Sequence, residues 1–146
     1  MKFQIKTFEE LNKTELYNIL QLRSEVFVVE QDCVYQDIDF KDQKSLHVFA
    51  SKNDKIIAYA RVFKPGDYFE NSSIGRVVVA DTERKHGFGH DLMKASIEAV
   101  NKYFNVDKIT ISAQKYLKKF YETHQFIQVG KEYLEDGIPH IRMDRN

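Results

Sequence analysis

Few residues in this sequence are of the kinds that cross-link a chain or break it into separate units. Only one residue is cysteine, two are proline and six are glycine, and tryptophan is absent. The single thiol, Cys33, allows neither a disulfide within the chain nor a zinc site made of cysteine pairs. Gly/Ser-rich linkers, low-complexity stretches and internal repeats are also missing. We therefore expect one domain that spans residues 1–146.

Neither sign of charge predominates, and no long apolar run is present. Lys+Arg and Asp+Glu both number 22, so the formal net charge is zero. A dedicated nucleic-acid or membrane-surface binder needs an excess of positive charge, so we expect neither as a partner. Residues 1–6 lack the apolar core of a signal peptide, and no stretch approaches membrane-spanning length. These features predict a cytoplasmic protein.

Hydrophobic periodicity divides the chain into a mixed α/β arrangement. Apolar residues make up 42% of the chain, which suits a globular domain of this length with one core. Alternating or β-branched runs predict strands, and apolar residues at helical spacing predict helices. We expect strands near 3–8, 46–51, 56–63, 72–80, 108–113, 126–133 and 138–143, and helices near 12–27, 92–104 and 116–124. Between them, residues 31–44 show no period and predict an ordered loop or short irregular helix.

Three β-branched residues stand together in the expected strand 72–80. They are Val77, Val78 and Val79. Such a run is typical of a strand that is buried on both faces, because a strand with one solvated face alternates apolar and polar residues. We therefore place this strand in the middle of the sheet.

A glycine-containing turn follows that strand and leads directly into a helix. Its sequence is Arg84-Lys85-His86-Gly87-Phe88-Gly89-His90. A helix start exposes backbone N–H groups without partners and carries the positive end of the helix dipole. Glycines let an anion approach that backbone, and Arg84 and Lys85, together with His86 when it is protonated, add positive charge nearby. The turn can therefore cradle a pyrophosphate, although Gly-x-Gly turns also serve as plain strand-to-helix connections.

Two common phosphate-binding motifs do not fit this turn. A P-loop requires Lys and Ser/Thr after its last glycine, but His90 and Asp91 follow Gly89. A dinucleotide-binding fingerprint requires a third small residue where Leu92 stands. The pattern Arg-x-x-Gly-x-Gly after a strand instead resembles the acetyl-CoA signature of the GNAT superfamily of N-acetyltransferases.

A second GNAT-like pattern lies further along the chain. Phe120-Tyr121 and Phe126 fall at the spacing of the Leu-Tyr and Gly-Phe pairs of that superfamily, while Gln114, Leu117 and Gln125 replace its Asn, Ala and Gly. Three further stretches resemble its ElaA-like branch: Leu22-Arg23-x-x-Val26-Phe27-Val28-Val29-Glu30-Gln31, Tyr35-Gln36-Asp37-Ile38-Asp39 and Glu135-Asp136-Gly137-Ile138-Pro139-His140. Because the order of elements also matches, the resemblance covers nearly the whole chain.

The resemblance implies a GNAT fold, which is a mixed, mostly antiparallel sheet with splayed central parallel strands and flanking helices. The pantetheine arm of acetyl-CoA would enter the gap between the splayed strands. The residues implied in cofactor binding are Val77, Val78, Val79, Arg84, Lys85, His86, Gly87, Phe88, Gly89, His90 and Gln114. His86 and His90 have a metal-like spacing but no clear third ligand, so we expect no metal.

Tyr121 is the implied general acid, which would protonate the departing CoA thiolate. A phenol with a pKa of about 10 can donate to a thiolate with a pKa of about 8.5 only if it is held in place. From its position beside Phe120 alone, Tyr121 fits a core aromatic residue better than a catalytic one, and it is the match to the family pattern that favours the general acid. Cys33 has no activating histidine nearby in sequence, so we expect an inert thiol and direct transfer without a covalent intermediate.

Two acidic segments correspond to the loops that flank the acceptor pocket in the GNAT arrangement. The first contains Asp37 and Asp39, and the second contains Glu135 and Asp136. Their carboxylates would favour a cationic amine and take its proton, although each also fits a solvated loop charge. His140 is either a base in the pocket or a hydrogen-bonded strand residue.

We therefore expect an enzyme that transfers an acetyl group from acetyl-CoA directly to an amine acceptor, with a small cationic amine as the acceptor. One alternative is a module that senses acetyl-CoA without turnover. The other is an acetyltransferase that modifies a protein lysine or N-terminal amine, which would need an open groove. The sequence leaves a homodimer open.

Overall fold

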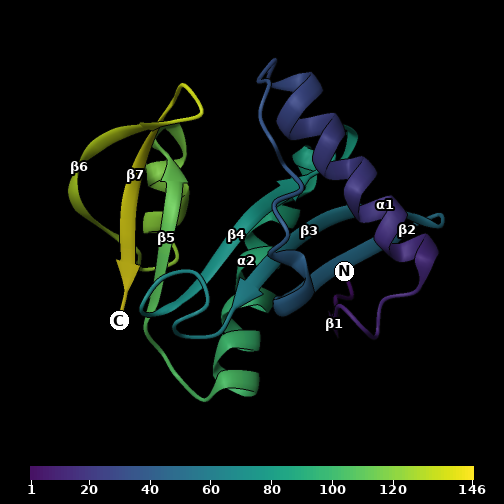
Figure 1. The fold of residues 1–146 in the computed structure, drawn as a ribbon, viewed down its shortest axis with the longest axis horizontal. Helices are drawn as coiled ribbons and strands as arrows, with labels where there is room; N and C mark the ends of the chain where they lie inside the picture. The colour runs from purple at the N-terminus through teal and green to yellow at the C-terminus, as the bar shows by residue number, and fades with distance from the viewer.

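Seven strands form one sheet in the computed structural model, which describes residues 1–146 (Figure 1). The strands are β1 (Gln4–Thr7), β2 (Leu46–Lys52), β3 (Lys55–Phe63), β4 (Ser72–Val79), β5 (Ile109–Gln114), β6 (Ile127–Glu135) and β7 (Ile138–Arg145). The helices are α1 (Lys13–Arg23), α2 (Phe88–Ala99) and α3 (Lys118–Glu122). The strand order is β1-β2-β3-β4-β5-β7-β6, and only β4 and β5 run parallel. The expected α/β arrangement is confirmed.

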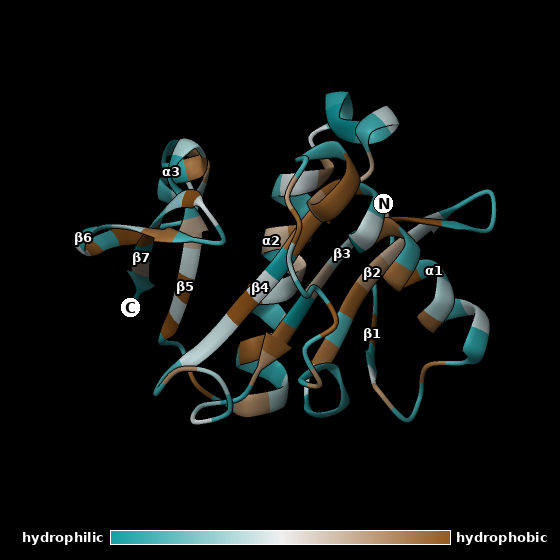
Figure 2. Cartoon of the chain, turned by 45° about the horizontal axis from the view of Figure 1, so that its top comes forward, coloured by the Kyte–Doolittle hydropathy of each residue, from teal (hydrophilic) through white to brown (hydrophobic).

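Alternate residues of the central strands belong to two separate hydrophobic cores, one on each face of the sheet. Val48 and Ala60 point to the face that α2 covers through Leu92. The residues that follow or precede them in the strands, such as Phe49 and Tyr59, point to the opposite face, where α1 packs. Figure 2 shows apolar stretches along β2 and β4 and largely polar outer loops. The two-residue period of a strand therefore gives each helix its own apolar layer.

Helix α1 begins where the sequence predicts it. The side chain of Asn12 accepts a hydrogen bond from the Glu15 N–H (2.8 Å), and the Asn12 N–H donates to the Glu15 carboxylate (3.0 Å). This reciprocal pair satisfies two N–H groups that a helix start leaves unpaired. The helix continues as a π-helical segment, η1 (Ser24–Glu30), which carries the chain to the edge of the cavity described below.

The other two expected helices also differ from their predictions. The helix that follows the glycine turn ends as α2 at Ala99, and residues Val100–Phe104 form a π-helical segment, η4. The stretch expected to be helical over 116–124 is a 3-10 turn, η5 (Lys115–Leu117), and the five-residue helix α3. A 3-10 turn aligns residues three apart and a π-helical turn aligns residues about four to five apart, so a tighter or wider turn can still keep apolar residues on one side. None of the helices combines the length and the apolar character that crossing a membrane requires.

The parallel strands β4 and β5 separate after a short contact. Only Ser72 and Ser73 pair with β5, opposite Ile109 and Thr110. Beyond them a β-bulge shifts the register between β3 and β4, and Arg76 lies within it with φ +50°. A bulge bends its strand and increases its twist, so β4 leads away from β5. The splayed central strands expected from the resemblance are therefore present, as Figure 1 shows.

Candidate active site

A cavity of about 520 Å³ lies at the divergence of β4 and β5. Its walls come from both strands, from η1 and the segment after it, from α3, and from the β6–β7 turn. Two contacts bridge the two sides: the Gln114 side-chain N–H group donates to the Gln31 side-chain oxygen (3.3 Å), and the Cys33 thiol donates to the Asp136 carbonyl oxygen (3.4 Å). Segments from both halves of the sheet therefore meet across the cavity.

The three consecutive valines of β4 lie along this cavity. Val78 is buried, but Val77 and Val79 are only half-buried, so the expected burial on both faces holds for one of the three. The reason is the splay, which leaves this part of β4 without a neighbouring strand on the β5 side. Backbone groups on that edge are available to an extended ligand. The Val79 carbonyl oxygen already accepts a hydrogen bond from Arg84 Nε (3.0 Å).

The glycine turn forms a helix start without a side-chain cap. Gly87 precedes α2 in the left-handed conformation (φ +71°, ψ +15°), which only glycine adopts at little cost. No side chain accepts from the first N–H groups of α2. At Gly89, a Cβ would lie 3.4 Å from the Phe120 ring, so the lack of a side chain permits close packing against α3. This uncapped helix start lies where the sequence predicts an anion cradle.

The cationic residues of the turn differ in whether they line the cavity. Arg84 lines the cavity but pairs with Glu30 of η1 (2.7 Å). Lys85 and His86 are exposed and do not line the cavity. His90 also lies outside its lining, and its Nδ1 lies 3.0 Å from His124 Nε2, so one of the two nitrogens carries the shared proton. The structure contains no group of three or more His, Cys, Asp or Glu residues placed to hold a metal ion.

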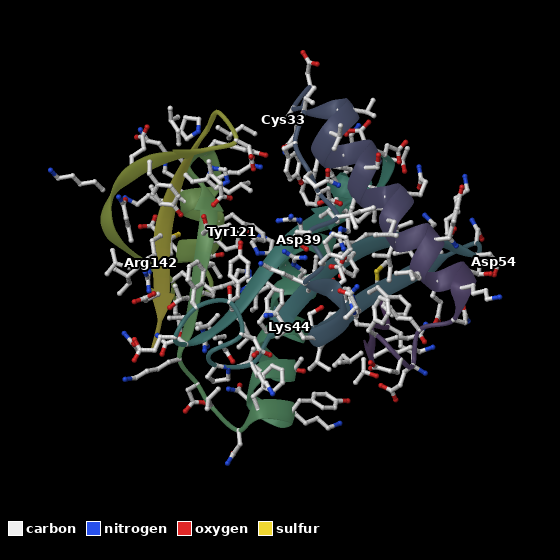
Figure 3. The ribbon with its side chains drawn as sticks, in the orientation of Figure 1. Cys33, Asp39, Lys44, Asp54, Tyr121 and Arg142 are labelled. Atoms are coloured by element: carbon white, nitrogen blue, oxygen red, sulfur yellow. The ribbon has the colours of Figure 1, made fainter.

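Tyr121 lies in the cavity wall between the diverging strands, as Figure 3 shows. Its side chain is buried (6% exposed), and its ring packs edge-on against Phe120 and Phe126. Burial raises the pKa of Tyr121 above its usual value, and the neighbouring Tyr116 adds to this rise. The phenol therefore keeps its proton at neutral pH, and it can donate this proton to a group that enters the cavity.

A second set of polar residues lines the wall formed by β5 and the β6–β7 hairpin. His140 Nδ1 donates to the Ile138 carbonyl oxygen (2.7 Å), which leaves His140 Nε2 facing Glu135 Oε2 at 3.5 Å. The other oxygen of Glu135 accepts from the Ser112 hydroxyl (3.2 Å), and Ser112 also contacts the Tyr133 hydroxyl. The structure thus brings Glu135 and His140 together with Ser112 in the lining of the cavity, whereas Tyr133 lies outside the lining.

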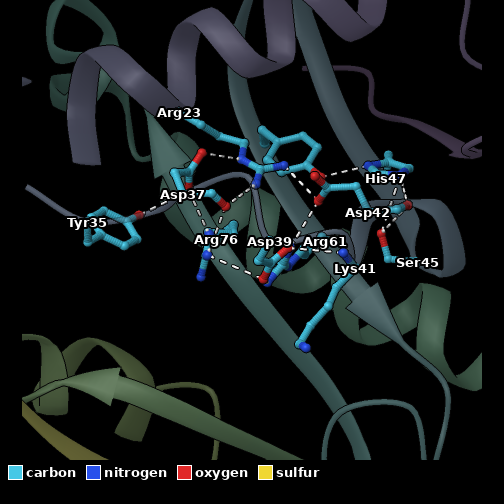
Figure 4. Close-up of polar contacts among 11 residues, drawn as sticks. Arg23, Tyr35, Asp37, Asp39, Lys41, Asp42, Ser45, His47, Arg61 and Arg76 are labelled. Carbon is cyan, nitrogen blue, oxygen red and sulfur yellow. Dashed lines mark hydrogen bonds and ion pairs between the residues drawn. The ribbon is translucent and has the colours of Figure 1, made fainter. Parts of the chain in front are cut away.

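Asp37 and Asp39, in contrast, do not line the cavity. Asp37 is held by Arg23 Nε (3.0 Å) and Arg76 Nε (2.7 Å), and it also accepts from the Tyr35 hydroxyl (3.0 Å). Asp39 pairs with both terminal nitrogens of Arg61 (2.8 and 2.6 Å). The placement of these carboxylates in the acceptor pocket is therefore not supported, because three arginines from α1, β3 and β4 occupy them (Figure 4).

Asp42 completes this charged network beneath the cavity. It accepts from Arg23 (2.8 Å) and Arg61 (2.9 Å), and all three side chains are nearly inaccessible. Burial alone would raise the pKa of Asp42, but the charges and hydrogen bonds of the two arginines outweigh burial and lower this pKa. Because three arginines face three aspartates, the charges within the network balance.

Comparison with known proteins identifies the family. A family model described as an acetyltransferase (GNAT) domain matches residues 9–146. The chain belongs to the GNAT acetyltransferase family. Among curated GNAT relatives, protein ElaA of Escherichia coli is 44% identical over 138 residues, which cover 93% of this chain and 90% of ElaA. A UPF0039 protein of Schizosaccharomyces pombe is 40% identical over 145 residues, which cover 98% of this chain and 95% of the yeast protein.

Solved structures of GNAT proteins agree with this assignment. The crystal structure of an acyl-CoA N-acyltransferase from Pseudomonas aeruginosa matches with a TM-score of 0.94 and 37% identity, and each chain is covered completely. That of Escherichia coli ElaA matches with a TM-score of 0.91 and 39% identity, again over both whole chains. The resemblance to the ElaA-like branch is thus confirmed. Membership of this family implies an acyltransferase that uses a CoA thioester and an amine acceptor.

Proposed function

We propose that this protein is an N-acetyltransferase that moves an acetyl group from acetyl-CoA directly to a small amine. The observation that carries the proposal is one shared cavity. Onto it open the unpaired edge of β4, the uncapped start of α2 at Gly89, and the protonated phenol of Tyr121. A thioester cofactor needs a place for an extended arm, a place for its phosphates and a proton donor for its thiolate, and this cavity offers all three.

The cofactor would lie along β4 as an added strand. Val77, Val78 and Val79 would pair with the amide groups of the pantetheine arm, and one of their N–H groups would polarise the thioester carbonyl. The pyrophosphate would accept from the N–H groups of Gly87, Phe88, Gly89 and His90 at the start of α2, where the helix dipole favours negative charge. Arg84, Lys85 and His86 would supply positive charge nearby, and Gln114 would face the arm from β5.

The residues on the opposite wall would handle the protons of the acceptor. An alkyl ammonium has a pKa near 10 and must lose a proton before its nitrogen can attack. Glu135, with His140 3.5 Å away, is placed to take that proton. The amine then forms a bond to the acetyl carbon as the carbon–sulfur bond breaks, and the new amide nitrogen releases its second proton to solvent. Tyr121 would give its proton to the departing thiolate and recover one from solvent.

The free carboxylates at the cavity favour a positively charged acceptor. Arg84 neutralises Glu30, whereas Glu135 and Asp136 have no lysine or arginine partner. The contacts that bridge the cavity through Cys33 and Gln114 narrow its opening, which favours a small molecule over a protein side chain. Both features support the small cationic amine expected from the sequence.

A turnover assay tests this proposal. The protein is mixed with acetyl-CoA and a panel of small amines and lysine peptides, and both released thiol and acetylated product are measured. We expect amine-dependent thiol release and a product heavier by one acetyl group. Faster turnover of propionyl-CoA or longer thioesters would contradict the acetyl assignment. Binding of acetyl-CoA without turnover of any amine would favour a sensor, and preferential acetylation of peptides would favour a protein-modifying enzyme.

A further inference from the structure

A side pocket of about 50 Å³ adjoins the main cavity. The residues that line both are Ile74, Gly75, Arg76, Ser112 and Glu135. Arg61, Phe63, Tyr68 and Ser73 line the side pocket only. A buried water needs roughly 10–15 Å³ of such space, so this pocket has room for one carboxylate-sized group rather than for a whole substrate.

Two arginines in this pocket keep unused hydrogen-bond donors. Arg76 binds the aspartates through Nε and one terminal nitrogen, and its other terminal nitrogen has no protein partner. Figure 4 shows this nitrogen turned away from the aspartates. Arg61 is 1% exposed, and its Nε is buried without any hydrogen-bond partner. A guanidinium has donors only, so a partner for these nitrogens must bring a hydrogen-bond acceptor.

A buried donor without a partner is costly, so the unused Arg61 Nε needs an explanation. Arginine also matches a carboxylate better than other oxygen groups, because two of its N–H groups can donate to the two carboxylate oxygens. The same pocket contains Glu135, which has the opposite charge. The pocket thus offers donors for an anion beside an acceptor for a cation.

Charge balance indicates how these two features are used together. The arginines and aspartates of the network already neutralise one another, so an anion alone would add a net negative charge to a buried region. A molecule with both an ammonium and a carboxylate would add none. Its ammonium can face Glu135 while its carboxylate faces Arg76.

We propose that the acceptor is an amino acid, whose carboxylate occupies the side pocket at Arg76 and Arg61 and whose amine faces Glu135. This inference deepens the proposed function and rests on it. It divides the small amines into those that carry a carboxylate beside the amine and those that do not, and it favours the first class.

Calorimetry of the protein saturated with CoA tests the proposal without requiring turnover. The ligands are the standard amino acids, each compared with its amide and with the amine in which hydrogen replaces the carboxylate. We expect at least one amino acid to bind about tenfold more tightly than both of its counterparts, in line with hydrogen bonds to a charged group. In the turnover assay, the same amino acid should be the preferred acceptor.

Arg76→Gln and Arg76→Lys should remove the preference for the amino acid over its amide and its decarboxylated amine. The affinity for the decarboxylated amine should stay as weak as in the unaltered protein. Arg142→Gln, a matched change at an exposed arginine of β7 outside both cavities, should retain it. An unchanged thermal shift with acetyl-CoA shows that each variant is folded and that the cofactor site is intact.

Equal or tighter binding of the decarboxylated amines would overturn the inference, and so would equal binding of the amides. Failure of acetyl-CoA to bind would instead contradict the proposed function. The calorimetric comparison concerns only the acceptor, so the two results can be told apart.

Discussion

The phenol of Tyr121 is the residue whose chemistry is most sharply defined. Burial raises its pKa, so the phenol keeps its proton at neutral pH and is not a base there, as the proposed role of proton donor requires. A proton donor in the transition state contributes about 10²–10⁴-fold to a rate. We therefore expect Tyr121→Phe to lower kcat by about 100-fold and to leave acetyl-CoA binding unchanged, as measured by initial rates of thiol release.

Tyr103→Phe is a matched control, because Tyr103 is half exposed on η4 and does not line the cavity. Its kcat should equal that of the unaltered protein. If Tyr121→Phe retained full kcat with a good acceptor, another group would have to protonate the thiolate.

The aspartates of the buried network predict how stability depends on pH. Burial alone would raise the pKa of Asp39, but Arg61 outweighs burial and holds this pKa well below its usual range, and Asp42 is also lowered. The unfolded chain thus binds more protons than the folded one as pH falls below about 4, so folding stability must decrease there. Urea unfolding between pH 2.5 and 7 should show a full free energy of unfolding above about pH 5 and a steady loss below about 4.

Asp42→Asn should flatten this acid limb and lower stability at neutral pH. Asp54→Asn, in the exposed β2–β3 turn labelled in Figure 3, should leave the slope intact. A free energy of unfolding that stays constant down to pH 2.5 would show that the aspartate–arginine pairs contribute no stability.

The same network shows what the sequence could not reveal at this scale. Asp37 and Asp39 were expected at the acceptor pocket because they cluster in a loop that flanks it. Their partners Arg23, Arg61 and Arg76 lie 14 to 39 residues away in the chain, on three different elements. Clustered carboxylates are visible in a sequence, but the arginines that neutralise them are found only once the chain has folded.

At the scale of elements, the start of α2 depends on one backbone conformation. Gly87 has φ +71°, and a left-handed conformation costs other residues about 1–2 kcal/mol. Gly87→Ala should therefore lower the free energy of unfolding by about 1 kcal/mol and weaken acetyl-CoA binding, as measured by urea unfolding and calorimetry.

Gly75→Ala is the control for stability, because Gly75 has no positive φ and a Cβ there would meet no atom within 4 Å. Its free energy of unfolding should change by less than about 0.5 kcal/mol. If the two variants were equally stable, the left-handed turn would not determine where α2 begins.

Strands were more predictable than helix ends. The strand expected over 56–63 is β3 at Lys55–Phe63, because β-branched runs bounded by polar turns leave little choice of register. The helix expected over 116–124 shrinks to five residues, since Gln114 before it is held by Gln31, the residue after η1, and by pairing with His140 of β7. Packing of this kind is tertiary and leaves no period in the sequence.

For the whole molecule, the decisive feature is that one sheet parts in its middle. The order of elements and the glycine turn could be read from the sequence. The family resemblance that they carry also implied that the central parallel strands splay apart. The contacts across the cavity could not be predicted from the sequence, because they join Gln31 to Gln114 and Cys33 to Asp136, which lie 83 and 103 residues apart in the chain. Neither could the side pocket, to which β3, β4, β5 and β6 each contribute residues.

The central claim is that this divided sheet holds acetyl-CoA, and a thermal-shift comparison of acetyl-CoA with CoA, NAD, FAD and ATP tests it most directly. Ligand at 100 times its Kd stabilises a protein by about 2.7 kcal/mol, which corresponds to roughly 5–10 °C in Tm for a chain of this length. We predict such a rise with acetyl-CoA and CoA and little change with the other three. A rise with NAD or FAD but none with the CoA compounds would contradict the account.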